Sequence, residues 1–193
     1  MPLTSAQLTA LKADINNNST QITVGGVLIA IKDIPNTPDN NFDIRDWYNG
    51  IASPDYWIWR SEMRRAEIYT ATPAEATAWD WVGFKNQGVP EQNAWFEMFM
   101  GGTCNFGNAN NRAGALAIFG TAGAGGANRT HIFNSVRRLV RRIEKLLAVA
   151  VLNPPANTGN NAAQPRGSAA NPDVFGYEGT VTADEVTAAR NLP

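Results

Sequence analysis

Cysteine and histidine are almost absent from this chain, which has one of each, Cys104 and His131, among 193 residues. A single cysteine excludes an internal disulfide and a metal site built from several cysteines. A single histidine excludes a histidine-rich metal site. Neither residue has neighbours that indicate a catalytic partner, and the carboxylates are dispersed. We therefore expect a structural or surface role for His131 and a loop position for Cys104, with no catalytic, cofactor-binding or metal-binding residues and no enzymatic activity.

Charge is also scarce, at 17% of the residues against about 25% in an average globular domain. The 16 basic and 17 acidic residues leave a net charge of −1. This balance excludes a polybasic coat for nucleic acid or for a membrane as a description of the whole chain. It also gives weak electrostatic repulsion between copies, which favours a protein that is stable within an assembly.

Long apolar runs and nucleotide-binding motifs are missing as well. No run of 18 apolar residues occurs, so we expect no transmembrane helix and no membrane partner. The first five residues lack a basic region followed by an apolar one, so no signal peptide is expected. The glycines at 123, 125 and 126 are not followed by Gly-Lys-Ser/Thr, and Asn128 stands where a dinucleotide motif needs glycine. We interpret this segment as a loop.

Tryptophan, in contrast, is abundant, with six residues. Aromatic side chains supply the largest buried area in a small core, so we assign most of them to core packing. Trp57 and Trp81 each lie two residues from a tryptophan that fits the apolar face better. These two are the ones we expect to be exposed.

Local signals predict a mainly α-helical bundle with a small β element and an extended C-terminal arm. Thr4 and Gln7 form the capping box of a first helix that ends at residues 16–18. Gly25 and Gly26 separate two β-branched runs and predict a hairpin within 21–31. Further helices are predicted over 41–49, 53–70, 72–85, from Pro90 to the glycines at 101–102, and over 111–120.

The strongest helical pattern covers 129–150, where apolar residues recur at i, i+3, i+4 and i+7. Basic residues fall on the opposite side of the helical wheel. Arginine pairs well with carboxylates and phosphates, so this side is interpreted as facing a protein partner or DNA, with a merely solvated face as the alternative. The basic face comprises Arg137, Arg138, Arg141, Arg142 and Lys145.

The composition changes after this helix and divides the chain into three parts. We predict a helical body over 1–152 and an extended linker over 153–172, which is too small and polar to bury itself. Residues 173–193 form a docking arm with a short strand over 174–181 and a helix capped by Thr182 and Glu185. The arm is expected to dock on its own body or on a neighbouring copy through Val174, Phe175, Tyr177, Val181 and Val186.

Several stretches, spread over most of the chain, form a recognisable set, and none of them is a catalytic motif. The stretches are Leu3–Leu8, Ile34–Asp39, Trp57–Arg60, Asn111–Arg112 with Ile118–Phe119, Arg142–Ala148 and Gly176–Gly179. Together they resemble small virion proteins found at the head–tail junction of tailed bacteriophages.

This resemblance implies a head-to-tail connector, also called an adaptor. Such proteins form homo-oligomeric rings, commonly of twelve copies, beneath the portal protein of the capsid. The ring extends the DNA channel and offers a docking surface to the tail or to a second neck protein. The expected location is therefore the neck of the virion, after synthesis in the host cytoplasm, with non-specific contact to channel DNA as a further expectation.

Three other functions are compatible with the sequence. A tail terminator or a capsid cement protein would also be a non-enzymatic oligomer that carries arms. A small helical DNA-binding protein would use the basic face of 129–150 and would bind duplex DNA with a strong dependence on salt.

Overall fold

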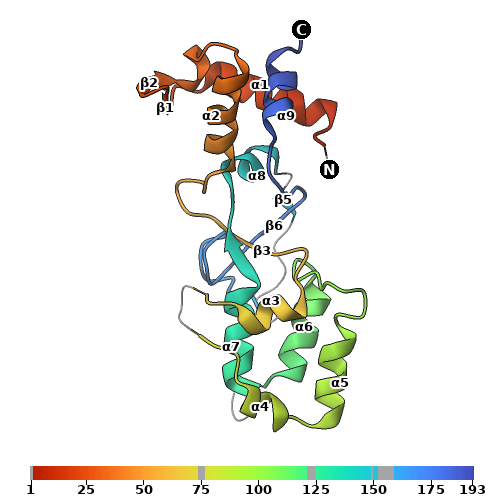
Figure 1. Cartoon of the computed structure of the whole chain (residues 1–193). Coiled ribbons are helices and arrows are strands. Elements are labelled where there is room, and N and C mark those ends of the chain that lie inside the picture. The colour runs from red at the N-terminus through yellow and green to blue at the C-terminus, as the bar shows by residue number, and fades with distance from the viewer. Residues whose placement is uncertain (1, 74–76, 121–124, 149, 152–158) are drawn as a thin grey trace. The chain divides into compact units, whose positions relative to one another are not determined.

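The computed structural model describes residues 2–73, 77–120, 125–148, 150–151 and 159–193 (Figure 1). Over these residues the chain forms nine α-helices and small two-stranded antiparallel sheets, so the expected fold class is confirmed. The chain divides into two compact units. Unit 1 comprises Met1–Asp55, Val140–Val149 and Phe175–Pro193, and unit 2 comprises Tyr56–Leu139 and Ala150–Val174.

This division differs from the predicted body, linker and arm. Each unit is assembled from segments that are far apart in the sequence, so the chain passes between the units several times. Residues of the expected arm are shared between both units, and residues of the expected linker belong to unit 2.

Unit 1 is a small helical cluster with a hairpin. Helix α9 packs against both α1 and α2, and β1 packs against α2. Its elements are α1 (Ser5–Asn17), β1 (Gln21–Val24), β2 (Val27–Ala30), the 3₁₀ helix η1 (Ile31–Asp33), α2 (Pro38–Asn49), α8 (Arg142–Leu147) and α9 (Ala183–Arg190).

Capping residues define the first and last helices of unit 1. The Thr4 hydroxyl accepts from the Gln7 amide at the start of α1, and the Gln7 side chain accepts from the Thr4 amide. Thr182 and Glu185 form the same reciprocal pair at the start of α9. Both predicted capping boxes are therefore confirmed. Helix α2 begins three residues before its predicted start, because Thr37 caps it and Pro38 occupies its first turn.

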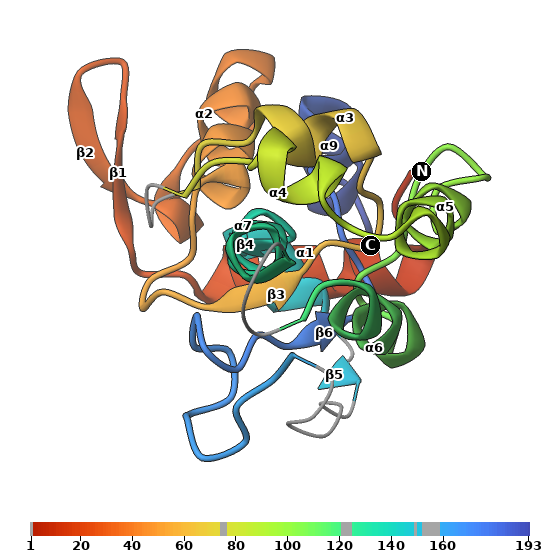
Figure 2. The ribbon, with the colours of Figure 1, turned by 90° about the horizontal axis from the view of Figure 1, so that it is seen from below.

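The predicted hairpin is confirmed, and its tight turn depends on glycine. Strands β1 and β2 are antiparallel, with Val24 opposite Val27, and only two residues connect them (Figure 2). Gly25 and Gly26 have φ angles of 56° and 84°. Residues with side chains adopt these left-handed angles at a cost, whereas glycine does not.

The C-terminal segment completes the core of unit 1. Val181 and Val186 are buried, together with Leu11, Ile44 and Ile143 from three other helices. The Asn49 side chain fastens the segment by exchanging two hydrogen bonds with the Val181 backbone, at 2.8 and 2.9 Å. The part of the arm that begins at Phe175 therefore docks on its own chain, which was one of the two expected outcomes.

Unit 2 has an aromatic core surrounded by short helices. Trp59, Trp79, Trp95, Phe106 and Phe119 are all buried in it. Its elements are β3 (Trp57–Trp59), α3 (Arg65–Thr70), α4 (Trp81–Lys85), α5 (Val89–Glu97), α6 (Ala109–Ile118), α7 (Gly126–Ser135) and β4 (Arg137–Leu139); β5 (Ala150–Val151) and β6 (Val174–Phe175) are two-residue strands where the chain changes unit.

The prediction of one long helix over 129–150 is wrong. Helix α7 ends at Ser135, whose hydroxyl bonds back to the His131 carbonyl at 2.7 Å, and the chain then forms strand β4. A separate helix, α8, covers only Arg142–Leu147. The apolar residues that predicted one helix are buried without it. Val136 is fully buried in unit 2, and Val140 and Ile143 are fully buried in unit 1.

Two further helical predictions are only partly correct. Of the helix predicted over 53–70, Arg65–Thr70 forms α3, whereas residues 53–64 are not helical. Within them, Trp57–Trp59 forms strand β3, which pairs with β4 so that Trp57 lies opposite Leu139. Aromatic and β-branched residues favour strands, but the local sequence pattern could not show that a partner strand lies far along the chain. Of the helix predicted over 72–85, the described residues form only Trp81–Lys85, capped by Asp80, and residues 74–76 lie outside the described residues.

Three other predicted boundaries change. Helix α5 begins one residue earlier than predicted, at Val89, and ends at Glu97. Helix α6 begins at Ala109, two residues before its predicted start, because Asn108 caps it, and it ends at Ile118. The strand predicted over 174–181 is limited to β6.

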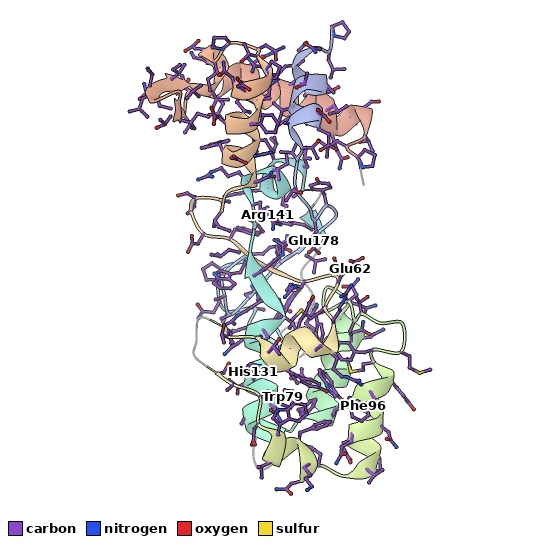
Figure 3. The ribbon with its side chains drawn as sticks, in the orientation of Figure 1. Glu62, Trp79, Phe96, His131, Arg141 and Glu178 are labelled. Atoms are coloured by element: carbon purple, nitrogen blue, oxygen red, sulfur yellow. The ribbon has the colours of Figure 1, made fainter. Side chains whose placement is uncertain are left out.

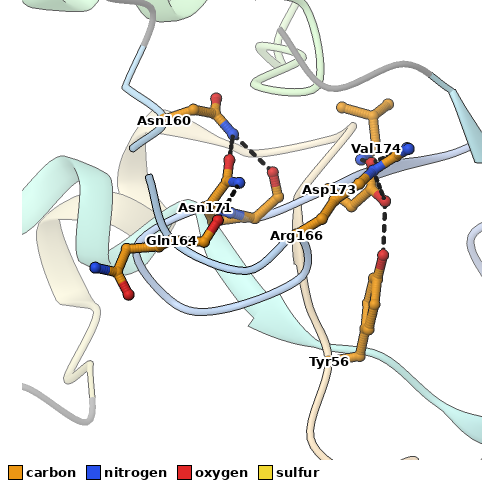
Figure 4. Close-up of polar contacts among 8 residues, drawn as sticks. Tyr56, Asn160, Gln164, Arg166, Asn171, Asp173 and Val174 are labelled. Atoms are coloured by element: carbon orange, nitrogen blue, oxygen red, sulfur yellow. Dashed lines mark hydrogen bonds and ion pairs between the residues drawn. The ribbon is translucent and has the colours of Figure 1, made fainter. Parts of the chain in front are cut away.

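Residues 159–172, expected to be an extended linker, instead form ordered turns in unit 2. Asn160 and Asn171 are 4% and 6% exposed, and their side chains bond to each other at 3.0 Å (Figure 4). Asn160 also bonds to the Pro172 carbonyl at 2.8 Å and accepts from the Trp59 indole at 3.2 Å. The expectation that this segment cannot bury itself is therefore wrong for residues 159–172: short amides that satisfy one another replace apolar contacts.

Candidate functional site

The five residues of the predicted basic face do not share one helix. Arg137 and Arg138 lie in β4 of unit 2, whereas Arg141, Arg142 and Lys145 lie at or in α8 of unit 1. The prediction of a single basic helical face is therefore wrong, and the contacts of its residues differ between the two units.

In unit 1, two of the arginines hold the protein's own backbone and side chains. Arg141 precedes α8, and its guanidinium lies 3.5 Å from the fully buried carboxylate of Glu144, which in turn accepts from the Gly179 amide at 2.8 Å. Arg142 donates to the Trp47 carbonyl at 2.8 Å and stacks over the Trp47 ring at 4.8 Å. Both arginines therefore fix α8 against neighbouring segments of unit 1.

Arg142 and Lys145 also border a pocket of unit 1 with a volume of about 430 Å³. Asp14 also lines this pocket, and its carboxylate accepts a hydrogen bond from the Tyr48 hydroxyl. Burial, and then this bond, raise the pKa of Tyr48 well above its usual value, so the phenol stays neutral. The remaining lining residues are Asn18, Thr20, Trp47, Ala52, Ser53 and Leu146.

In unit 2, Arg137 and Arg138 also have intrachain partners. Arg137 donates to the Ala169 carbonyl and lies 5.5 Å from the centre of the Trp57 ring. Arg138 donates to the Leu139 carbonyl at 3.1 Å. Both arginines lie in a strand that pairs with β3, so they take part in the structure of unit 2.

The predicted docking-arm residues are also divided. Val174 packs against the core of unit 2, whereas Tyr177, Val181 and Val186 belong to the core of unit 1. The Tyr177 hydroxyl donates to the Thr180 carbonyl at 3.2 Å, and burial raises its pKa. Phe175 is half-buried in β6.

His131 and Cys104 are buried in unit 2, as a structural role requires. The His131 Nε2 donates to the Ile68 carbonyl at 2.7 Å, which leaves Nδ1 to accept from the Thr77 hydroxyl at 3.2 Å. Figure 3 shows His131 beside Trp79, and their ring centres are 6.3 Å apart. Burial raises the pKa of the Cys104 thiol to about 11, which disfavours the reactive thiolate.

One buried cation was missed by sequence reasoning. Arg112, in α6, is fully buried, donates to the Phe106 carbonyl and lies 5.0 Å from the centre of the Trp59 ring. Burial lowers its pKa to about 10. No local signal could have found this role, because Trp59 is more than fifty residues earlier in the chain.

Large apolar side chains are exposed in both units. In unit 2 they gather on or beside α4 and α5, where Trp81 is 57% and Met100 is 84% exposed. In unit 1 the hairpin exposes Val27 and Leu28 immediately after its turn, at 59% and 63%. Exposure of Trp81 was predicted, while Trp57 is half-buried. The other exposed members are Phe42 and Ile51 in unit 1, and Val82, Val89 and Phe96 in unit 2.

Within the described ranges, no three or more His, Cys, Asp or Glu side chains are placed to hold a metal ion. In the same ranges, no helix has the length and apolar character needed to cross a membrane. Comparison of the chain with protein-family models, curated proteins and solved structures finds no match.

Proposed function

We propose that this protein is a structural subunit of a homo-oligomeric ring in the neck of a tailed bacteriophage. The ring would connect the portal of the capsid to the tail, or to a second neck protein, and extend the DNA channel. The assignment to the neck is supported by the sequence stretches that resemble head–tail junction proteins. The observation that carries assembly is the set of exposed large apolar side chains on the hairpin and around α4 and α5.

Two exposed aromatic side chains of unit 2, Trp81 and Phe96, pack against the same buried ring, that of Phe84. The ring centre of Phe84 lies 6.5 Å from that of Trp81 and 5.8 Å from that of Phe96. Trp81 is 57% exposed and Met100 is 84% exposed, so both leave hydrocarbon in contact with water. A partner that covered this surface would gain a free energy of about 25 cal/mol for each Å² of apolar area buried. Exposed clusters of this kind mark interaction sites.

The alternative of a small DNA-binding protein loses its main support. It depended on five cations on one helical face, and that helix is absent from the described residues. Arg137 and Arg142 instead contact backbone carbonyls and tryptophan rings of their own units. Contact with DNA in the channel remains a part of the proposal that depends on the assembled ring.

Native mass spectrometry and negative-stain imaging of the purified full chain, alone and with the portal protein, test the proposal. We expect a discrete closed oligomer, twelve copies in the simplest case, that stacks on the portal ring. A chain that stays monomeric at all concentrations and ignores the portal would contradict the proposal.

Copy number per virion separates the proposed connector from two other positions. A connector or a tail terminator is present as one ring, whereas a cement protein is present in many copies over the capsid. Labelling the protein in intact virions and counting it gives this number, and imaging of the label distinguishes the portal side of the neck from the end of the tail.

A further inference from the structure

A groove of about 390 Å³ opens on the surface of unit 2, beside helix α3. Tyr69 and Phe99 provide its aromatic walls, and Arg64 and Arg65 provide its charge. The Arg65 guanidinium lies 4.4 Å from the centre of the Phe96 ring, which links the groove to the exposed apolar surface. The groove therefore combines aromatic surface with two cations.

No carboxylate lines this groove among the described residues. Within the same part of the chain, neither Arg64 nor Arg65 takes part in an ion pair. The nearby acid Glu67 accepts from the Arg64 backbone amide and pairs with Arg60 at 3.2 Å, and Glu62 is exposed. An occupant that carries carboxylates beside an apolar side chain would complement the groove.

Unit 1 carries a surface with those properties on helix α2. Asp39, Phe42, Asp43 and Asp46 follow the i, i+3, i+4, i+7 spacing and fall within about 100° of the helical wheel. The buried residues Asn41, Ile44 and Tyr48 lie on the opposite side of the helix. Phe42 is 47% exposed, so an aromatic side chain stands in water beside three carboxylates.

This acidic surface continues beyond α2. A groove of about 500 Å³ between α2 and the start of α9 is lined by Phe42, Asp46 and Asp184. The one cation in its lining, Arg45, is paired with Asp46 at 2.6 Å and lies over the Phe42 ring at 4.8 Å. The α2 surface is therefore acidic and aromatic, where the α3 groove is basic and aromatic.

We propose that the α3 groove of one copy receives the α2 surface of a second copy of this chain. Phe42 would contact the aromatic walls at Tyr69 and Phe99, while Asp43 and Asp46 would face Arg64 and Arg65. The contact joins two different surfaces, so it is heterologous, and repetition closes a ring when the rotation per copy permits closure. This inference rests on the proposed function for the claim that the repeated contact closes into a neck ring.

A charge-exchange experiment on the full chain tests the contact. One variant reverses the groove (Arg64→Glu with Arg65→Glu), and the other reverses the α2 surface (Asp43→Lys with Asp46→Lys). We expect each variant alone to lose the oligomer in native mass spectrometry, because like charges then face each other at every contact. An equimolar mixture of the two restores it, since every contact again joins an acidic surface to a basic one and the two variants alternate.

Matched controls reverse charges that line neither groove and lie outside α4 and α5: Lys32→Glu with Arg129→Glu, and Asp33→Lys with Asp55→Lys. These controls should retain the wild-type oligomer. Circular dichroism and thermal unfolding establish that each variant folds. Raising the salt concentration should weaken wild-type assembly and reduce the difference between the variants and wild type, because these charges are exposed or half-buried and salt screens them.

The outcomes separate this inference from the proposed function. Oligomers that persist in both reversed variants, or variants that fail to complement each other, overturn the docking inference and leave a portal-bound ring possible through other surfaces. Charge-exchange rescue without a closed ring or portal binding supports the docking inference and contradicts the neck assignment. A wild-type chain that never self-associates overturns both.

Discussion

Asp173 shows how one buried carboxylate organises the turns of residues 159–174. Its side chain is fully buried and pairs with Arg166, with the Nε–Oδ2 distance at 2.7 Å. It also accepts hydrogen bonds from the Tyr56 hydroxyl at 2.7 Å and from the Val174 amide at 2.8 Å (Figure 4). These donors compensate the hydration that the carboxylate loses on burial, and each donor is ordered in return.

The Tyr56 hydroxyl makes this arrangement sensitive to alkaline pH. Burial, followed by the hydrogen bond to Asp173, raises the pKa of Tyr56 to about 12. A group whose pKa is raised by folding contributes stability below its unfolded pKa of about 10, and that contribution disappears as the pH rises towards 12. We therefore expect Tyr56→Phe to be less stable than wild type at pH 7, by about 1 kcal/mol for one lost hydrogen bond.

The difference between the two proteins should shrink between pH 10 and 12, because wild type alone loses the Tyr56 contribution there. Urea unfolding at a series of pH values measures it. Subtracting the variant from wild type cancels the effect of the other tyrosines and of Cys104. A stability difference that stays constant across this range would contradict the assigned role of Tyr56.

Residues whose roles depend on neighbours close in sequence were predicted well. Thr4 and Thr182 cap their helices as expected, and the residues that complete their capping boxes lie three positions later. Arg112 and Asp173 were missed because their partners, such as Trp59 and Tyr56, are remote in sequence. A buried charge can be recognised only when the groups that satisfy it are known.

Elements closed by local hydrogen bonds were likewise predictable, and elements closed by remote partners were not. The hairpin pairs residues within 21–30, so its two-residue turn specified it. Strand β4 pairs with β3, about eighty residues earlier. The apolar spacing of 136–147 fits a helix just as well, and tertiary pairing overrode that pattern.

Hairpin stability should depend on the backbone angle of Gly26 rather than on space around it. Its φ is +84°, and a Cβ added there would meet no atom within 4 Å. Gly26→Ala should therefore destabilise unit 1 by about 1–2 kcal/mol through the left-handed conformation alone. Gly101→Ala is the matched control, because it has the same open space without a positive φ.

Chemical denaturation measures both glycine variants. The control should be within about 0.5 kcal/mol of wild type, as expected for a surface substitution. Equal losses in the two variants would show that the turn conformation is not the cause.

Helix α9 should be as important to unit 1 as the helices near the N-terminus. Val186 is fully buried among residues of α1, α2 and α8. Val186→Ala removes two methyl groups, at about 0.8 kcal/mol each before any cost of the cavity. We expect the thermal midpoint of unfolding to fall, whereas Ala188→Ser, on the exposed side of the same helix, should leave it unchanged.

Because the C-terminal residues belong to both units, a truncation cannot test the docking arm alone. A protein lacking residues 153–193 would lose the buried Val181, Val186 and Ala189 of unit 1 and the Asp173 network of unit 2. Its failure to assemble would therefore report unfolding rather than the loss of a docking arm. Point substitutions on exposed positions separate the two effects, because they leave both cores intact.

Assembly by the whole molecule should depend on its exposed apolar side chains. Leu28 of the hairpin and Met100 after α5 are 63% and 84% exposed, so Leu28→Ser and Met100→Ser remove hydrocarbon that no described part of the chain covers. Where the substituted side chain is buried between two copies, the substitution should weaken their association at least tenfold, because a tenfold change in the dissociation constant requires only about 1.4 kcal/mol. Concentration-dependent native mass spectrometry measures the shift, with Ala127→Ser and Ala188→Ser as exposed controls. Unchanged association in both variants would place any interface between copies elsewhere on the surface.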